Sequence, residues 1–465
     1  MTQHLRFAPF LPKLIAQAVL LSFSLGTLVS PALSAQATSD PEIPPKSTTV
    51  SNESLEDSPK AIVDEIWQII NNEFVNKNFN HVNWQAKRQE LLSKNYRDRK
   101  QAYKEIAKLL KELGDPYTRF LEPDDFQQLT NQTAGEMSGV GLRMTLDKRT
   151  NDLYVVEPIK NSPAMKAGIQ IGDRIIKING KPTALMNLEQ ASQEIQGAIG
   201  TDVNLELFRK GKGAFNVTLT RAQIEIDSVT YAVKENNNTR VGYIRLDEFS
   251  SHAAEQMKAA IEELDKKEIS GYVLDLRGNP GGLLFASVDI ARMWLKQGEI
   301  VSTIDRKGGD RHFTANGTAI TNLPLVILVD NGSASASEIL TGALKENGRA
   351  TIVGTRTYGK GTVQSVHSLS DGSGLAVTIA RYYPPSGTDI NHKGINPDIY
   401  LDLSLDQQLR LRNDPSLVAT DLDPHFLQAV SVLKSRATNL SKPITPSKPV
   451  GMTLQNSKLV SGSDF

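Results

Sequence analysis

One stretch, residues 323–344, reads LPLVILVDNGSASASEILTGAL and passes from one kind of secondary structure to another. Leu323 to Val329 form a continuous apolar, largely β-branched run, which is typical of a strand buried on both faces of a sheet. Asp330-Asn331-Gly332 then turns the chain, and beyond residues 333–338 the apolar positions recur with helical spacing. The stretch therefore predicts a buried strand, a turn and a helix, the unit from which an α/β core is built.

The segments around this unit differ in their patterns. From Val241 to about Leu403 strand-like and helix-like patterns alternate, whereas residues 139–226 show short strands and turns, and residues 59–113 show helical spacing. The predicted fold class is an α/β multidomain protein. Its predicted divisions are a disordered linker (38–58), a helical N-terminal region (59–132), a β-sandwich or barrel with two helices (133–227), an α/β sandwich core (228–405), a C-terminal helical segment (406–438) and a disordered tail (439–465).

Length and composition limit the classes of function. A chain of 465 residues is long enough for about three domains. Lysine plus arginine and aspartate plus glutamate balance at 52 each, so the charge predicts no nucleic-acid partner. The sequence contains no cysteine, which excludes a thiol nucleophile, a thiolate metal site and disulfides.

Residues 1–37 have the pattern of a signal peptide. A weakly basic start precedes an apolar run from Leu14 to Val29, and Ala35-Gln36-Ala37 is the predicted cleavage site, with Ala32-Leu33-Ser34 as a rival. An uncleaved membrane anchor is the alternative. Cleavage is favoured because a spanning helix needs about 20 predominantly apolar residues, and this run is shorter and interrupted by polar side chains. The mature protein is therefore predicted to lie outside the cytoplasm.

The segment 133–227 carries two glycine motifs. Gly139-Val140-Gly141-Leu142 precedes a predicted strand, and residues 172–180 read GDRIIKING before a predicted helix near 188–195. In this order the motifs resemble a PDZ domain in its circularly permuted bacterial form. The resemblance implies that a peptide adds as a strand to a sheet edge, while amides of the loop Gly139, Val140, Gly141 and Leu142 hold its carboxylate. Glycine is expected there because a Cβ would block the approach. Taken alone, the first motif is merely a turn before a strand.

The hydroxyl-rich segment after the buried strand is a candidate for nucleophilic chemistry. Residues 333–338 read SASASE and lie at a predicted helix N-terminus, where free amides and the positive dipole end favour an alkoxide or oxyanion. The alternative is ordinary helix capping, with Ser333 or Ser335 as the N-cap and Glu338 as its capping-box partner. On this segment alone, capping is favoured.

Lys360 is the candidate base. It lies between Gly359 and Gly361, and strand-like runs precede and follow it. Burial lowers the pKa of a lysine from its usual value of about 10.4, and an uncharged lysine can act as a general base. The alternative is a solvated loop lysine.

Other chemistries have less support. Gly354 to Lys360 fits the first part of a phosphate-binding loop, but Gly361 stands where a magnesium-binding Ser or Thr belongs, so no nucleotide is expected. His367 and His392 lie in the core segment, and composition alone leaves a Ser/His/Asp triad open although neither histidine stands in a motif. The sequence shows no His-Glu-x-x-His and no other ligand spacing, so no metal and no cofactor is predicted.

Several motifs in order carry a family resemblance. They are LGDPYTRF (113–120), LDLRGNPGG (274–282), SASASEI (333–339), YGKGTVQ (358–364), LSDGSG (369–374) and YYPPSG (382–387). Together with the PDZ-like segment they resemble the carboxy-terminal processing, or tail-specific, serine peptidases over nearly the whole mature chain. The subset that they resemble most contains the photosynthetic enzymes that trim a photosystem II subunit precursor.

The resemblance implies a Ser/Lys dyad. The family's spacing between nucleophile and base selects Ser335 among the neighbouring serines and pairs it with Lys360. Gln364 would orient the lysine amine by a hydrogen bond. The oxyanion hole would combine the amide of Ala336 with one from the glycine turn at Gly281. The adjacent glycine, Gly282, is the alternative second donor.

The predicted function is that of an exported serine endopeptidase, in the periplasm or the thylakoid lumen. It would cleave proteins near their carboxyl ends after the PDZ-like domain has bound an apolar C-terminal tail. Peripheral membrane association stays open. The alternative is a non-catalytic PDZ adaptor or scaffold, which loss of Ser335, Lys360 or Gln364 would favour, and all three are present.

Overall fold

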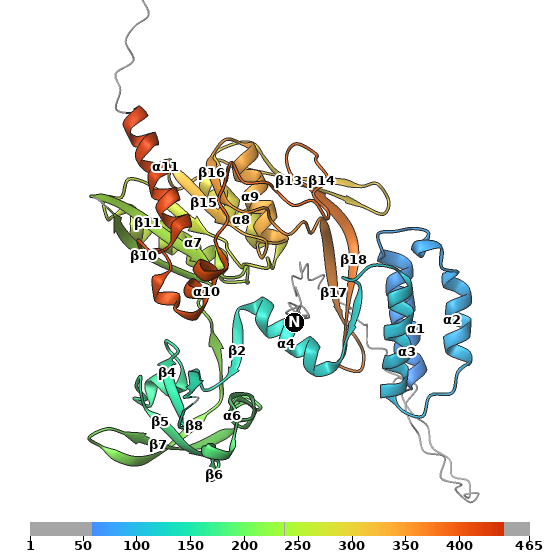
Figure 1. Cartoon of the computed structure of the whole chain (residues 1–465). Helices are drawn as coiled ribbons and strands as arrows, with labels where there is room; N and C mark the ends of the chain where they lie inside the picture. The colour runs from blue at the N-terminus through green and yellow to red at the C-terminus, as the bar shows by residue number, and fades with distance from the viewer. Residues whose placement is uncertain (1–57, 148, 237, 441–465) are drawn as a thin grey trace, which may run out of the picture.

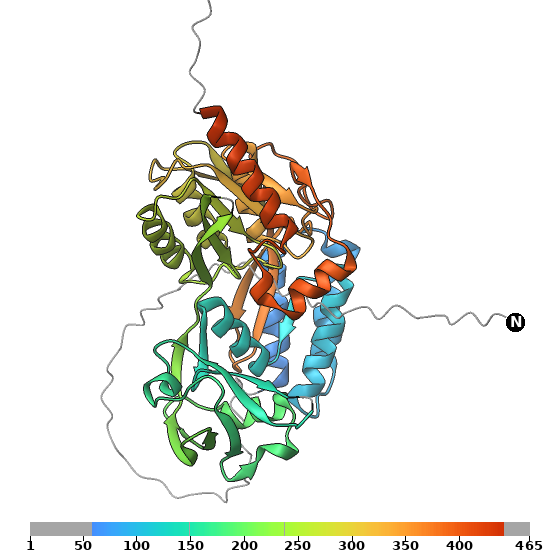
Figure 2. The same ribbon diagram turned by 60° about the vertical axis from the view of Figure 1, so that its left-hand side comes forward.

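The structure is a computed structural model that describes residues 58–147, 149–236 and 238–440 (Figure 1). The predicted signal peptide, nearly all of the predicted linker and nearly all of the predicted tail lie outside the described residues. Within the described ranges no helix is both long enough and apolar enough to cross a bilayer. A helical region, a small β-rich domain and a larger α/β core are distinct in Figures 1 and 2, which confirms the predicted fold class.

Three helices form the N-terminal region: α1 (Pro59–Glu73), α2 (Trp84–Ser93) and α3 (Arg99–Glu112). They begin at the side-chain caps Ser58, Asn83 and Asp98. Their apolar faces share a core with Leu369, Leu375 and Val377, which come from a hairpin near the other end of the described chain. The helices therefore pack against this β17–β18 hairpin (362–383) rather than standing alone.

A short connection leads from these helices to the small domain. Strand β1 (Arg119–Leu121) pairs antiparallel with β18 (Gly374–Tyr383), and helix α4 (Pro123–Ala134) follows it. Leu121 and Leu129 pack with Val366 and Ala376 of the hairpin. Strand β1 of this connection thus joins a sheet whose other strands belong to the predicted core segment.

The small domain is a six-stranded antiparallel sheet with two helices. The strand order is β3-β4-β5-β7-β8, with β6 paired to β5. The elements are β3 (Leu142–Leu146), β4 (Leu153–Pro158), α5 (Pro163–Lys166), β5 (Arg174–Ile178), β6 (Lys181–Pro182), α6 (Leu188–Ile195), β7 (Asp202–Arg209) and β8 (Gly213–Thr220). The strands β2 (Glu136–Gly139) and β9 (Ala222–Glu225) pair with each other where the chain enters and leaves the domain. Strand β3 lies at an edge of the sheet.

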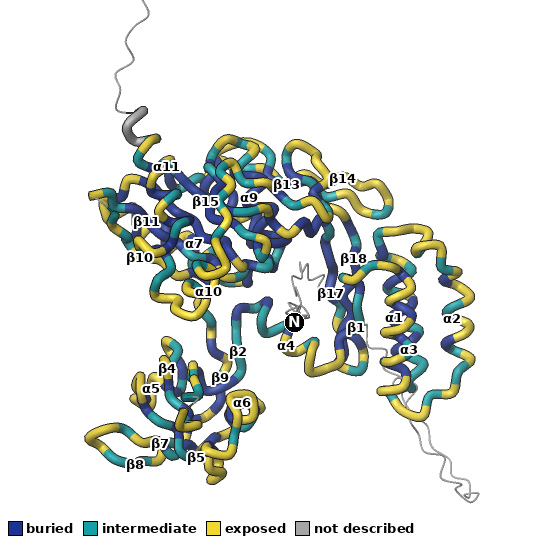
Figure 3. Tube along the Cα trace, viewed as in Figure 1, coloured by how far each residue is buried: buried dark blue, intermediate teal, exposed yellow. Residues whose placement is uncertain are grey.

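The core is built on a mostly parallel sheet of order β10-β11-β12-β15-β16-β19. Its strands are β10 (Val229–Asn236), β11 (Thr239–Leu246), β12 (Tyr272–Asp275), β15 (Leu325–Val329), β16 (Ala350–Gly354) and β19 (Ile399–Tyr400). Helices α7 (Ala253–Asp265), α8 (Leu284–Trp294) and α9 (Ala336–Glu346) pack on one face, and α11 (Pro424–Leu440) covers the other. All five residues of β15 are buried, as its apolar run predicts (Figure 3).

A second sheet joins the core to the helical region. It contains β1, β18, β13 (Glu299–Asp305) and β14 (Asp310–Thr314), and β17 (Thr362–Ser368) pairs with β18. The long β17–β18 hairpin extends from the core to the N-terminal helices (Figure 1). Strand β17 begins shortly after Lys360, so this sheet positions the candidate base.

Candidate active site

Ser335 occupies a strained turn between the buried strand β15 and helix α9. Its backbone has φ 57° and ψ −114°, outside the conformations that a residue with a Cβ adopts readily. Such strain typically costs about 1–3 kcal/mol and persists only where the surrounding structure holds it. The side chain is buried, and its Oγ has no hydrogen-bond partner among the described residues. The hydroxyl is thus not used to cap the helix.

Glu338 bridges the two candidate residues of the dyad. Its Oε2 accepts hydrogen bonds from the amides of Ser335 and Lys360, each at 2.9 Å. Its Oε1 accepts from Gly359 N at 2.7 Å and from Thr357 Oγ1 at 2.6 Å. The sequence identifies Glu338 as a capping-box partner, and it does bind the amide of Ser335. Its reach to the Lys360 turn is a role that the local pattern does not reveal.

Lys360 is buried, with 1% of its surface exposed, so it is not a solvated loop lysine. Loss of hydration lowers the pKa of its amine to about 7. The positive charge of Arg119 lowers this pKa further, and the carboxylates of Asp115 and Glu338 oppose the shift. The Nζ atom lies 4.7 Å from the ring centroid of Tyr117. A substantial fraction of Lys360 is therefore uncharged near neutral pH.

Tyr382 of β18 ties the backbones of the two residues together. Its buried hydroxyl donates to the carbonyl of Ser335 at 3.2 Å and also to the carbonyl of Lys360. The amide of Tyr358 donates to Ser333 O at 3.0 Å, which fastens the lysine turn to the serine turn a second time. Two turns that a helix and a strand separate in the sequence are thus held side by side.

Gln364 lies on β17 with its side chain buried. Its Nε2 donates to Thr362 Oγ1 at 3.0 Å and to Thr378 Oγ1 at 3.1 Å, while its Oε1 has no partner among the described residues. Because Oε1 and Ser335 Oγ are both unpartnered, the expected hydrogen bonds from Lys360 to Gln364 and to Ser335 are not formed in this structure. Hydrogen bonds at active sites often tighten only when substrate binds.

The predicted oxyanion donors lie beside Ser335. Ala336 is the first residue of α9, so its amide has no carbonyl partner within the helix. A Cβ placed on Gly281 would lie 2.8 Å from Ser335 Cβ and 2.9 Å from Ala336 N, so this glycine approaches the nucleophile closely. The amide of Gly281 donates to Asn279 Oδ1 at 2.8 Å in this structure. Its service as an oxyanion donor stays a prediction.

The histidine and metal alternatives gain no support from the geometry. Since Ser335 Oγ has no partner, no described histidine is hydrogen-bonded to it. His367 instead lies 2.9 Å from a carboxylate oxygen of Glu73. Among the described residues no group of histidine and acidic side chains has the arrangement of a metal site.

Comparison with known proteins agrees with this geometry. Residues 240–401 match peptidase family S41, and residues 154–209 match a PDZ domain. The chain is 43% identical over 334 residues to the carboxyl-terminal-processing protease of Synechocystis sp., a match that covers 71% of this chain and 78% of that protein. The chain belongs to peptidase family S41. It is a carboxyl-terminal-processing serine peptidase, as its motifs predict.

Two further similarities support the membership in family S41. The chain is 37% identical over 393 residues to carboxyl-terminal-processing peptidase 3 of Arabidopsis thaliana chloroplasts, which covers 81% of this chain and 76% of that protein. The solved structure of a photosystem II D1 C-terminal processing protease is 38% identical, with a TM-score of 0.50, and the match covers 79% of this chain and 99% of that one. These matches extend well beyond the core of this S41 peptidase.

The predicted carboxylate-binding loop at residues 139–142 of this S41 peptidase has a structural reason for its second glycine. Gly141 has φ 75°, and a Cβ on it would lie only 2.2 Å from Ser162 Cβ. Ser162 caps α5, and the amide of Ala164 in that helix donates to Val140 O at 2.9 Å. The expectation that Gly141 serves only the approach of a carboxylate is therefore incomplete, because contact with Ser162 already requires glycine. Leu142 begins the edge strand β3, which lies next to α6.

A buried charged cluster lies behind the serine turn of this S41 peptidase. Arg277 donates to both oxygens of Asp275 and of Asp423, at 2.6–3.0 Å, and its Nη1 lies 3.2 Å from His425 Nδ1. Because an arginine only donates, Nδ1 accepts, and Nε2 of His425 donates to Leu401 O at 2.8 Å. The cluster fixes the start of α11 against the carboxyl end of β12.

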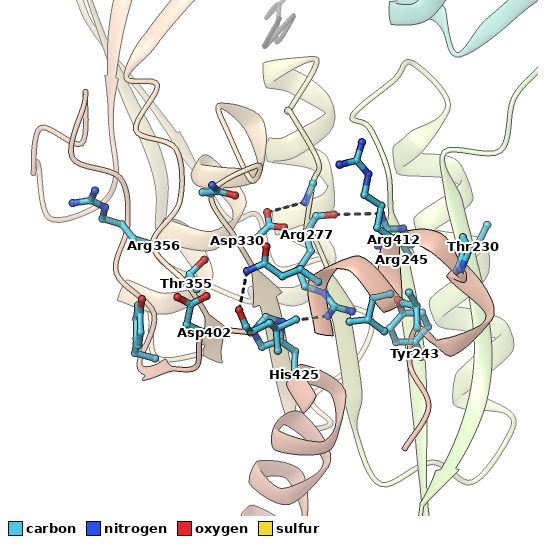
Figure 4. Close-up of a pocket in the computed structure, with 18 of the residues that line it drawn as sticks. Thr230, Tyr243, Arg245, Arg277, Asp330, Thr355, Arg356, Asp402, Arg412 and His425 are labelled. Atoms are coloured by element: carbon cyan, nitrogen blue, oxygen red, sulfur yellow. Dashed lines mark hydrogen bonds between the residues drawn. The ribbon is translucent and has the colours of Figure 1, made fainter. Parts of the chain in front are cut away.

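Arg277 and His425 of this cluster line an open cavity of about 1210 Å³ (Figure 4). Asp330 and Asn331, which precede the serine turn, line this cavity, but Ser335, Lys360 and Gln364 do not. The three candidate residues of the active site are at most 1% exposed. This open cavity is therefore separate from the dyad, which is closed to solvent in this conformation.

Gly281→Ala is expected to lower kcat/KM by at least about 100-fold, the typical effect of losing an oxyanion donor. The added methyl group would meet Ala334 O, Ser335 Cβ and Ala336 N within 2.9 Å, and φ of +107° is unfavourable for alanine. Gly308→Ala is the matched control, because φ is +82° there but no atom lies within 4 Å. Peptide cleavage and thermal unfolding are measured for both variants. Equal activity of the two variants would contradict a role for this close approach.

Proposed function

We propose that this S41 peptidase cleaves proteins near their carboxyl ends with Ser335 as nucleophile and Lys360 as general base. The observation that carries the proposal is the pairing of an unpartnered serine hydroxyl on a strained turn with a fully buried lysine whose pKa is about 7. Glu338 and Tyr382 hold the two backbones together. A general base works best when its pKa lies near the operating pH.

The proposed reaction is acyl transfer through an ester. Ser335 Oγ attacks the scissile carbonyl carbon while its proton passes to Lys360 Nζ. The amides at the N-terminus of α9, beginning with Ala336, stabilise the oxyanion. The tetrahedral intermediate then breaks its C–N bond, and Lys360 returns the proton to the leaving amine. Water attacks the ester, gives a proton to Lys360, and the proton returns to Ser335 as the acid is released.

We propose that the PDZ-like domain presents the substrate. Its strand β3 lies at the edge of the sheet next to α6, and Leu142 and Met144 of β3 are only partly buried on the domain core. An extended apolar tail could pair with this strand while the loop at Gly139–Leu142 receives its carboxylate. One structural relative is named for processing the C-terminus of photosystem II D1. The proposed substrates are accordingly protein tails in an exported compartment, the periplasm or the thylakoid lumen.

Ser335→Ala provides the test. Wild-type protein and the variant are incubated with a protein that ends in an apolar tail, and the products are weighed by mass spectrometry. Wild type is expected to release a C-terminal fragment, and the variant to release none while still binding a tail peptide with a free carboxylate better than its amide. Cleavage by the variant would overturn the role of Ser335. Tail binding without cleavage by wild type would favour an adaptor.

A further inference from the structure

Several buried polar side-chain atoms in the described part of the chain have no hydrogen-bond partner, and three of them belong to Ser335, Gln364 and Arg119. Within the described residues, five buried side-chain atoms lack a hydrogen-bond partner: Arg119 Nη2, Trp294 Nε1, Ser335 Oγ, Thr341 Oγ1 and Gln364 Oε1. Native proteins pair nearly all such atoms, so each exception needs an explanation. The proposed reaction accounts for the missing partner of Ser335 Oγ, which attacks the substrate. It also accounts for that of Gln364 Oε1, which would bind Lys360 only when substrate is present. It gives no role to Arg119.

Strand register places Arg119 on the same sheet face as Gln364. Arg119 on β1 stands opposite Ala376 of β18, and Gln364 on β17 stands opposite Thr378. Ala376 and Thr378 alternate with Val377 along β18, so their side chains share one face of the sheet. Residues directly opposite in an antiparallel pair point to the same side, so Arg119 and Gln364 share that face as well. Arg119 therefore lies on the sheet face that carries the lysine-orienting side chain.

The guanidinium of Arg119 lacks a fixed partner of its own. Its Nη2 is buried without a hydrogen bond, and no ion pair involves Arg119 among the described residues. Asp125 of α4 is the carboxylate whose charge acts on it, yet the two groups do not form a salt bridge. Leaving a charged donor buried and unpaired is destabilising, so the fold gains nothing from this arrangement. A bound molecule would supply the missing acceptor.

We propose that Arg119 forms a substrate subsite beside the dyad, where its Nη2 donates to a main-chain carbonyl of the bound polypeptide and its charge acts on Lys360. The inference rests on the proposed function, since it assigns a further substrate contact to the same active site. Arg119 then has two roles. Its Nη2 binds substrate, and the charge of its guanidinium acts on the reaction only through Lys360.

The charge balance around Lys360 selects a neutral acceptor. Arg119, Asp115, Glu338 and the ring of Tyr117 act on Lys360, and of these groups within the described residues Arg119 is the cation. A neutral carbonyl leaves the positive charge of Arg119 in place, which favours the uncharged amine. A substrate carboxylate would neutralise that charge and favour the protonated, inactive lysine. The subsite therefore fits a backbone carbonyl and disfavours an acidic side chain.

The test uses Arg119→Met, Arg119→Lys and the control Arg311→Met, in the full-length enzyme. Arg311 lies exposed on β14 and is not among the groups whose charge acts on Lys360. Loss of a hydrogen bond to a charged group predicts that kcat/KM of Arg119→Met falls about tenfold or more, mainly through KM. The fall of kcat/KM on the acid side of its pH profile, the acid limb, is expected to move to higher pH. The reason is that the pKa of Lys360 rises when the neighbouring cation is removed. Arg119→Lys keeps the charge, so its acid limb stays in place while KM rises.

The melting temperature separates function from structure. Arg119 is half-buried, and its Nη2 is buried without a hydrogen-bond partner among the described residues, so Arg119→Met is predicted to melt at the same or a higher temperature than wild type. An unchanged KM and acid limb in an active Arg119→Met enzyme would overturn the subsite, and so would a lower melting temperature with wild-type kinetics. Failure of the proposed function can be distinguished from failure of the Arg119 subsite, because in the former case wild type itself would not cleave tail substrates.

Discussion

Replacement of Lys360 by methionine is expected to abolish peptide cleavage and yet make the folded protein more stable near neutral pH. Methionine has a similar length but no amine, so Ser335 loses the base that removes its proton. Loss of a general base typically lowers the rate by about 100- to 10,000-fold. The buried position that makes Lys360 a base also makes it destabilising, because the fold holds it where a charged amine is disfavoured.

The stability effect has a definite dependence on pH. The pKa of Lys360 is about 7 in the folded protein, against 10.5 for an ordinary lysine, so the unfolded chain binds more protons between these values. The free energy of unfolding of wild type therefore rises with pH across the window from about 7 to 10.5. At pH 7 the shift corresponds to a penalty on the order of 4 kcal/mol, which methionine removes. Above the window the two proteins should differ little from this cause.

Two measurements check the Lys360 prediction. Denaturant unfolding of wild type and Lys360→Met from pH 7 to 10 gives the difference in stability, and Lys104→Met on the exposed face of α3 serves as the control. The kcat/KM of wild type should fall tenfold per pH unit below about pH 7, where Lys360 becomes protonated. An active Lys360→Met enzyme, or a stability difference that does not change with pH, would contradict the assignment of the base.

The elements around the dyad could be predicted because their signals are local. An uninterrupted apolar run identifies β15, and the helical spacing that follows identifies α9, so the place of Ser335 between them could be read from the sequence. The glycines on either side of Lys360 mark a turn before β17. Family motifs then select the serine and the lysine, and the comparisons confirm the family.

The contacts between distant segments could not be predicted in this way. Arg119 shares a sheet face with Gln364 because β1 pairs with β18, which lies far along the chain beyond the whole PDZ-like domain, and no pattern near either strand specifies that pairing. The ion pair of Arg277 with Asp423 likewise joins two segments that are remote in the sequence. The backbone strain at Ser335 also leaves no mark in the sequence, because serine is not a residue that usually signals a positive φ.

The local pattern at Glu338 was informative but incomplete. A serine followed three residues later by glutamate correctly predicts that the carboxylate binds the amide of Ser335. A capping box leaves the second carboxylate oxygen without an assigned partner. That oxygen accepts from Gly359 N and Thr357 Oγ1, so it adds two contacts to the link that Oε2 already makes between Ser335 N and Lys360 N.

Glu338→Ala is expected to lose most of its activity and several kcal/mol of stability together. Four donors would lose their acceptor, and each buried donor left unpaired costs about 1–3 kcal/mol, less whatever water recovers. Burial raises the pKa of Glu338, but the four donors oppose that shift and favour the carboxylate. Glu346→Ala, at the exposed end of the same helix, is the control, because its carboxylate binds only Ser386 among the described residues.

Glu338→Gln distinguishes a positioning role from a general loss of packing. A glutamine has nearly the same shape, but only one of its two terminal groups can accept, so it can keep the amides of Ser335 and Lys360 only by turning its own NH₂ toward Thr357 and Gly359. Thr357 Oγ1 can accept from that NH₂, whereas Gly359 N cannot, so one of the four contacts is lost rather than all of them. We therefore expect kcat and stability between those of wild type and Glu338→Ala, with KM nearly unchanged because Glu338 does not contact substrate. If Glu338→Gln and Glu338→Ala lowered kcat equally, the negative charge itself would be required, and if both retained wild-type kcat, the link between the two turns would not position the dyad.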